Sequence, residues 1–303
     1  MVQEREYSIP GGSLYYEVIE DPGSGNGIRI TRLQGLAGEV VIPGQIDGCP
    51  VRSIAKKAFL SKKNLRKVTV PASVAEVGDW AFAYCDSLHT VVFEAGESSL
   101  RFGRAVFLEC KNLRFLSVND GDETTAALLA AAVTTADAPY LLDACEAGGG
   151  EWLEKWDARM LAVLRSADSE GYSKQVLCGE EDYGSTDAAA YESGRRKLKV
   201  RLLLLRLLYS RGLSGEHRQE MEKYLKNHTK GCEYEETWQV VLTEHGEESA
   251  YYRLFAELGC ISEENFQQLL SDVGDGYPEL KAYLMRYKEE KLGYQDFFAG
   301  LDL

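Results

Sequence analysis

The sequence has little of what most catalytic and metal-binding sites require. It contains only four histidines in 303 residues, and its seven cysteines form no Cys-x-x-Cys pair. Neither the Gly-x-Ser-x-Gly motif of hydrolases nor the His-Glu-x-x-His motif of zinc proteases occurs. His228 and Cys232 are isolated from other metal-ligating residues, which favours an ordinary helix end over a zinc site. We therefore predict no catalytic residues, no cofactor and no metal, and expect that the protein is not an enzyme.

Long apolar runs are also missing. The longest, residues 198–209, includes Arg201 and Arg206 and is much shorter than the roughly 20 residues that a membrane-spanning helix needs. It predicts a buried helix and no membrane insertion. The first residues lack the apolar stretch of a secretory signal, and the dispersed, odd-numbered cysteines argue against a disulfide framework. These absences favour a cytoplasmic protein over a surface or secreted one.

Basic residues are outnumbered by acidic residues in only one part of the chain. Residues 1–118 contain 14 of the 34 Lys and Arg and 13 of the 48 Asp and Glu, a net charge of +1. Residues 119–303 hold the remaining 20 and 35, a net charge of −15. This asymmetry predicts two domains, residues 1–118 and residues 119–303. The acidic domain repels phosphates, which argues against nucleic acid as the principal partner.

One pattern of apolar residues occurs three times before residue 118. Its clearest copy runs apolar–Gly–x–x–Ala–Phe–x–x–Cys–x–x–Leu over residues 77–88. Each copy ends in a leucine that opens a strand-like segment, at residues 65–70, 88–93 and 113–118. A period of 23–25 residues with one strand per repeat predicts a solenoid in which equivalent side chains stack as ladders. The predicted ladders are Phe59/Phe82/Phe107 and Leu65/Leu88/Leu113, with Cys85 and Cys110 in a third.

These repeats resemble the BspA-type leucine-rich repeats of bacterial proteins, in the stretches "IPGQIDGCPVRSIAKKAF" and "NLRKVTVPASVAEVGDWAFAYCDSL". The cap that leads into such repeats is similar to the preceding "GGSLYYEVIEDPGSGNGIRITRLQGLAGEVVIP". The resemblance covers residues 11–118. It implies a β-solenoid whose strand face binds other macromolecules.

Helical patterns replace the strand patterns after residue 118. An apolar spacing of i, i+3, i+4 and i+7 begins at Trp238, Tyr251, Phe266 and Leu280, with glycines between the segments. It predicts short antiparallel helices joined by tight turns. Earlier helices are expected at residues 124–134, 138–147, 151–166, 195–212 and 215–228.

The last helices have a weak resemblance to ankyrin-type helices, in "AYYRLFAELG" and "PELKAYLMRYKEEKLG", without the Thr-Pro-Leu-His signature. The expected fold class is an α+β two-domain repeat protein. A short leucine-rich-repeat β-solenoid would be followed by an all-α helical-hairpin array.

Two groups of outward residues are candidates for contact with a partner. In the first, on the expected strand face, Val92 and Phe115 are apolar at positions where polar residues are expected. Its members are Lys67, Thr69, His89, Thr90, Val92, Arg114, Phe115 and Ser117. The second group lies in a stretch without acids, residues 48–75. Its members are Arg52, Lys56, Lys57, Lys62, Lys63 and Arg66.

Each group has alternative interpretations. The basic group is a solvated face, or it docks an acidic partner or the protein's own acidic helices. The strand face is covered by the helical domain, or it binds a partner. We favour non-catalytic protein–protein recognition or scaffolding, with a partner that the sequence does not identify. The alternatives are an enzyme with a site between distant helices, and nucleic-acid binding through residues 52–67.

Overall fold

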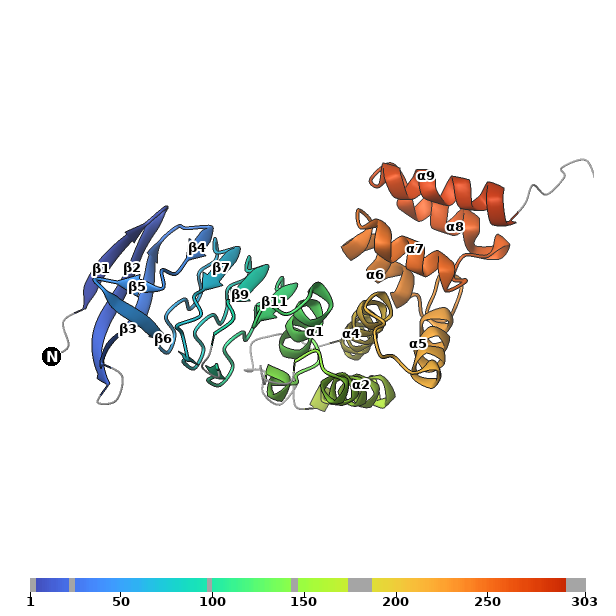
Figure 1. Cartoon of the computed structure of the whole chain (residues 1–303). Helices are drawn as coiled ribbons and strands as arrows, with labels where there is room; N and C mark the ends of the chain where they lie inside the picture. The colour runs from blue at the N-terminus through green and yellow to red at the C-terminus, as the bar shows by residue number, and fades with distance from the viewer. Residues whose placement is uncertain (1–3, 22–24, 97–99, 143–146, 174–186, 293–303) are drawn as a thin grey trace, which may run out of the picture. The chain divides into compact units, whose positions relative to one another are not determined.

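The computed structural model describes residues 4–21, 25–96, 100–142, 147–173 and 187–292 (Figure 1). The chain divides into two compact units, residues 1–162 and residues 163–303. The predicted change from strands to helices falls at the expected place, since the last strand ends at Val118 and the first helix begins at Glu123. The compact units divide later in the chain because this first helix packs against the last strand.

The first unit begins with an antiparallel cap. Strand β1 (Arg5–Ile9) pairs with β2 (Gly12–Asp21), and β2 pairs with β3 (Gly25–Gly35). Strand β3 then pairs in parallel with β6 (Cys49–Ile54), so the cap continues directly into the first coil of the solenoid. Leu14 and Ile28 of the cap are fully buried.

The solenoid has about four turns and is built on two sheets. The first sheet continues from β6 through the two-residue strands β8 (Glu76–Val77) and β10 (Arg101–Phe102), with β5 (Gln45–Ile46) at the side of β6. The second sheet is wholly parallel and consists of β4 (Glu39–Val41), β7 (Lys67–Val70), β9 (Thr90–Phe93) and β11 (Phe115–Val118). Figure 1 shows the strands of the second sheet lying side by side along the solenoid.

The predicted ladders form the solenoid core. The ring centroids of Phe59 and Phe82 lie 4.8 Å apart, those of Phe82 and Phe107 lie 5.6 Å apart, and both pairs are stacked. The Cys85 thiol donates a hydrogen bond of 3.0 Å to the Phe59 carbonyl, and the Cys110 thiol donates one of 3.0 Å to the Phe82 carbonyl. Each cysteine therefore ties its own coil to the preceding one as well as filling space.

The recurring glycines mark positions where successive coils approach closely. A Cβ atom at Gly78 would lie 2.5 Å from the backbone nitrogen of Lys56, and one at Gly103 would lie 2.6 Å from that of Asp79. Real Cβ atoms do not approach a backbone so closely, so both positions require glycine for the coils to stack. The glycine of the repeat pattern therefore has a packing role.

Helices complete the first unit. Helix α1 (Glu123–Thr134) begins at Asp122, whose carboxylate accepts a hydrogen bond of 2.8 Å from the Thr125 amide. A short 3-10 turn, η1 (Pro139–Leu142), and helix α2 (Gly150–Arg165) follow. The buried indole of Trp156 donates to the Leu128 carbonyl at 2.9 Å, which joins α2 to α1. The helix predicted at 138–147 is seen only as η1, and residues 143–146 lie outside the described part.

The second unit consists of successive helices. They are α4 (Ala188–Leu208), α5 (Gly215–Asn227), α6 (Glu236–His245), α7 (Ser249–Glu257), α8 (Glu263–Val273) and α9 (Pro278–Tyr287), followed by the π turn η2 (Lys288–Leu292). Neighbours in the chain pack together in the pairs α6–α7 and α8–α9, and α4 contacts α5, α6 and α7. The predicted helical segments are confirmed, whereas an ankyrin-like character is not.

Helix α4 contains the apolar run that was expected to be buried. Arg206 within it is fully buried, and its guanidinium donates a 3.1 Å hydrogen bond to the Arg211 carbonyl. Arg201 forms a two-bond ion pair with Glu244 on α6, with both N–O distances 2.7 Å. Among the described helices, none is both long and apolar enough to cross a bilayer.

The stacked rings make a prediction about stability. Replacing Phe82 by Ala removes the central ring of the ladder, and we expect it to lower the free energy of unfolding by about 3–5 kcal/mol. The matched control is Tyr84→Ala on the same coil, whose side chain is exposed and whose loss should cost about 0.5 kcal/mol or less. Urea denaturation measures both. Equal costs would contradict the ladder as the source of stability.

The buried thiols lead to a prediction about how stability depends on pH. Burial raises the pKa of Cys85 from 9.0 to about 11 and the pKa of Cys110 from 9.0 to about 12. Because the folded state holds these protons more tightly than the unfolded state, their stabilising contribution is complete below pH of about 9 and is lost as the pH rises from there towards 11 and 12. Denaturation of wild type and Cys110→Ala near neutral pH and near pH 10 tests this. The variant should lose less stability on alkalinisation, and an identical loss would refute the prediction.

Candidate partner-binding surfaces

The second sheet presents two rows of outward side chains. The strand register places one residue of each strand opposite the next, while the residues between them point into the core and are buried. The first row is Glu39, Lys67, Thr90 and Phe115. The second row is Val41, Thr69, Val92 and Ser117.

A third row lies just before these strands. The His89 amide donates to the Arg66 carbonyl at 2.9 Å, and the Arg114 amide donates to the His89 carbonyl at 3.0 Å, so the three residues are neighbours on successive coils. The imidazole of His89 lies 5.8 Å from the ring of Phe115, measured between centroids, and its Nδ1 lies 3.1 Å from Thr90 Oγ1. We call these three rows together the strand face.

The structure brings all eight predicted partner-binding residues together on the strand face. Their role in binding stays a prediction, and so does the coverage of Val92 and Phe115 by the helical domain. The face also includes residues that the sequence did not single out. Glu39 and Val41 from β4 extend two of the rows, and Val41 is 68% exposed. A three-residue strand ahead of the first full repeat gives too weak a pattern to assign its outward positions.

The strand face carries uncompensated positive charge. Arg66, Lys67 and Arg114 are exposed, and within the described part of the chain none of them has a carboxylate oxygen within 4.0 Å. Glu39 supplies the acidic side chain of the three rows. The face therefore combines cations, an aromatic pair and apolar side chains.

The predicted basic group is distributed over different parts of the coil. Arg52 lies in β6 of the first sheet, whereas Arg66 lies on the strand face. Lys56 and Lys57 hold their ammonium groups 4.6 Å and 5.5 Å from the ring centroid of Trp80. Their separation follows from the coil, which turns between the two sheets over these residues.

Another lysine of the basic group is paired with an acidic residue of the next coil. Lys63 forms an ion pair with Asp86. The 28-residue stretch without acids suggested unopposed charge, but in a solenoid the nearest neighbours lie one period away in sequence. The composition of one continuous stretch of sequence therefore cannot show which cations are paired.

A groove of about 670 Å³ lies on the first sheet. The register places Glu17, Arg29, Ser53, Glu76 and Arg101 in one row along it. Arg29 pairs with Glu17 at 3.0 Å, and Arg101 pairs with Glu76 at 3.8 Å. The charges of this row therefore compensate each other. This row is hard to predict from the sequence, because two of its strands have only two residues each.

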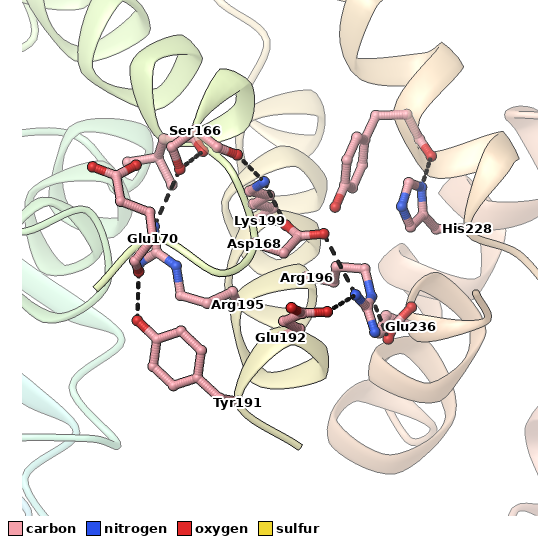
Figure 2. A network of polar contacts seen from close by, with 12 residues as sticks. Ser166, Asp168, Glu170, Tyr191, Glu192, Arg195, Arg196, Lys199, His228 and Glu236 are labelled. Carbon is pink, nitrogen blue, oxygen red and sulfur yellow. Dashed lines mark hydrogen bonds and ion pairs between the residues drawn. The ribbon is translucent and has the colours of Figure 1, made fainter. Parts of the chain in front are cut away.

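A buried ion network holds the second unit together (Figure 2). Arg196 on α4 pairs with Glu236 on α6 at 2.8 Å, and both side chains are almost fully buried. Arg196 also pairs with Asp168 at 3.4 Å and lies 4.1 Å above the ring centroid of Tyr234. Lys199, one turn further along α4, pairs with the same Asp168 at 2.6 Å.

The network continues to helix α5 through aromatic side chains. Burial, followed by the charges of Asp168 and Glu236, raises the pKa of Tyr224 well above its ordinary value. The rings of Tyr224 and His228 stack at 3.9 Å between centroids, and His228 Nδ1 lies 2.8 Å from the Tyr224 carbonyl oxygen. His228 thus occupies a packed helix end, and Cys232 directs its thiol to the Lys226 carbonyl at 3.5 Å.

The charges of this network neutralise one another, which is typical of an ion network that stabilises the packing of helices. Sequence reasoning missed it because Arg196 and Glu236 are 40 residues apart. In the described residues, no three His, Cys, Asp or Glu side chains gather as a metal site would require.

The repeats can be compared with known proteins on this basis. Residues 42–126 match the family model described as "BspA type Leucine rich repeat region (6 copies)". The solenoid coils are therefore BspA-type leucine-rich repeats, as the sequence predicted. No curated protein matches the chain.

Several solved structures of bacterial leucine-rich-repeat proteins are similar to part of the chain. A leucine rich cell surface protein from Faecalibacterium prausnitzii A2-165 is 28% identical, over 36% of this chain and 29% of that one, with a TM-score of 0.30. The T. pallidum leucine rich repeat protein is 30% identical, over 36% and 58%, with a TM-score of 0.26. A protein from Bacteroides capillosus is 26% identical, over 39% and 85%, with a TM-score of 0.31. The chain thus spans less than two thirds of the first two proteins.

The buried ion network leads to a prediction about the stability of the second unit. Arg196→Met leaves the buried Glu236 without its counter-charge and leaves Asp168 with Lys199 alone. We expect it to lower the free energy of unfolding by about 3 kcal/mol. The control is Arg218→Met, which breaks a partly exposed pair with Glu222 and should cost about 1 kcal/mol or less. Denaturation followed by tryptophan fluorescence measures both. Comparable costs would mean that the network adds no more than a surface ion pair.

Proposed function

We propose that this protein is a non-catalytic protein-binding module and that its strand face contacts the partner. Leucine-rich-repeat proteins are generally protein-interaction modules, because stacked coils present a continuous surface whose outward residues are free to vary. The matched family of residues 42–126 supports this class. A scaffold role, in which the helices bind a second protein, is compatible with the same proposal.

One observation carries the choice of surface. The strand face places His89 between the exposed Arg66 and Arg114, with the ring of Phe115 beside the imidazole and the apolar Val92 in the row next to Phe115. Aromatic residues and arginine are the types that contribute most to binding at protein interfaces, and an apolar centre with a polar rim is the usual arrangement. The groove on the first sheet has less of this character, since its charges pair with each other.

The alternative functions have weaker support. His228 and the carboxylates of Asp168 and Glu236 in the buried network contact neighbouring groups, which favours a structural role over catalysis. Nucleic-acid binding calls for a continuous track of cations, whereas the basic group is distributed between two sheets. A cytoplasmic location and docking of the acidic helices onto the basic solenoid stay predictions.

The proposal is tested by charge introduction on the strand face. Val92→Asp/Phe115→Asp places two carboxylates at the centre of the proposed interface, and we expect at least about a tenfold drop in the amount of protein captured from native lysate. The control Leu108→Asp/Tyr140→Asp alters two exposed apolar side chains outside the strand face and should capture as much as wild type.

The comparison requires that both variants unfold at the same thermal midpoint as wild type, so that a loss of binding does not reflect unfolding. If the strand-face variant recovers the same proteins in the same amounts as wild type, this surface is not the interface. If both variants lose them equally, general surface charge is the cause and the proposal is also wrong.

A further inference from the structure

Two arginines of the strand face lie two coils apart, with a histidine between them. Arg66, His89 and Arg114 occupy equivalent positions on three successive coils. Neighbouring strands of a sheet lie about 4.8 Å apart, so the backbones of Arg66 and Arg114 are separated by roughly 10 Å. Lys67 adds a third exposed cation beside Arg66.

An apolar and aromatic strip runs next to this charge. Phe115 lies against His89, and Val92 and Val41 are outward in the adjoining row. Glu39 lies opposite Lys67 at the far end of the first row, so the end near Arg114 and Phe115 has no acidic residue in the three rows.

From this arrangement we infer that the strand face binds an extended acidic protein segment, which runs across the strands. The inference rests on the proposed protein-binding function and deepens it by assigning the chemistry of the partner. Carboxylates of the segment pair with Arg66 and Arg114, and an apolar side chain between them packs on Phe115 and Val92. Charge complementarity decides that the segment is acidic, because exposed arginines without counter-ions attract carboxylates and repel basic segments.

The spacing also favours one backbone conformation. A polyproline II segment has three residues per turn and rises about 3.1 Å per residue, so side chains three apart lie on one side at about 9.3 Å. This matches the roughly 10 Å between Arg66 and Arg114. The preferred segment therefore has acidic residues three apart with apolar residues between them.

A protein segment fits this face better than nucleic acid. Glu39 repels phosphate groups, and the outward side chains of Val41 and Val92 offer them no hydrogen bond. The net charge of −14 also repels a polyanion at long range, whereas a short acidic segment is drawn in by the local cations.

Peptide titration tests the inference on the full chain. The probes are two fluorescein-labelled peptides, three repeats of Glu-Ala-Phe and three repeats of Lys-Ala-Phe, followed by anisotropy. We expect the glutamate peptide to bind with a Kd below about 1 mM and to weaken as sodium chloride rises from about 50 to about 300 mM. The lysine peptide should bind more weakly.

Charge reversal assigns the site. Arg66→Glu/Arg114→Glu should raise the Kd of the glutamate peptide by about tenfold or more. The control Lys223→Glu/Lys226→Glu makes the same change in net charge at exposed positions of α5 and should stay within about twofold of wild type.

Four results would overturn the inference. They are no binding of the glutamate peptide, tighter binding of the lysine peptide, equal effects of the two charge reversals, and tighter binding of a single-stranded oligonucleotide that Arg66→Glu/Arg114→Glu abolishes. The proposed protein-binding function is judged separately. If Val92→Asp/Phe115→Asp loses the captured proteins while Arg66→Glu/Arg114→Glu retains them, protein binding stands and the acidic segment is wrong.

Discussion

The stacking of one coil on the next is the constraint on which the solenoid depends. Phe59, Phe82 and Phe107 stack ring on ring, and the backbones meet so closely at Gly78 and Gly103 that no side chain fits between them. A slip of one residue would break the ring ladder and bring a Cβ atom into the preceding backbone. The same contacts that stabilise the core therefore fix the strand register, and the register places the outward residues in rows.

Each repeat contains two kinds of position, those that build the core and those that face outward. Core positions repeat their chemistry, as Cys85 and Cys110 do with equivalent hydrogen bonds to the preceding coil. Outward positions change from coil to coil, so that arginine, histidine and arginine follow one another in one row and lysine, threonine and phenylalanine in the next. Specificity therefore lies in the residues that do not recur, and the second unit, held by its own ion network, is free to differ in surface chemistry.

The sequence predicted the elements whose signal is periodic. The three copies of the repeat led to the solenoid and to the eight strand-face residues, and the apolar spacing from Trp238 onwards led to the last helices. It failed where the deciding contact is distant or the element short. The Lys63–Asp86 pair crosses one coil, and the Arg196–Glu236 pair joins two helices. Helix α4 begins at Ala188, ahead of the predicted residue 195. Its first turns were missed because they consist of exposed alanines and polar residues with Gly194 among them, show no apolar periodicity and depend on the Asp187 cap.

The central claim is that binding residues from separate coils act as one surface. Hydrogen–deuterium exchange on the full chain, with and without a partner recovered by the wild-type protein, tests it most directly. The account predicts that the partner slows exchange together in the segments around residues 66–69, 89–92 and 114–117, which are distant in sequence and adjacent in the second sheet. Slowed exchange confined to the first sheet or to the helices of residues 188–287, with these three segments unchanged, would contradict it.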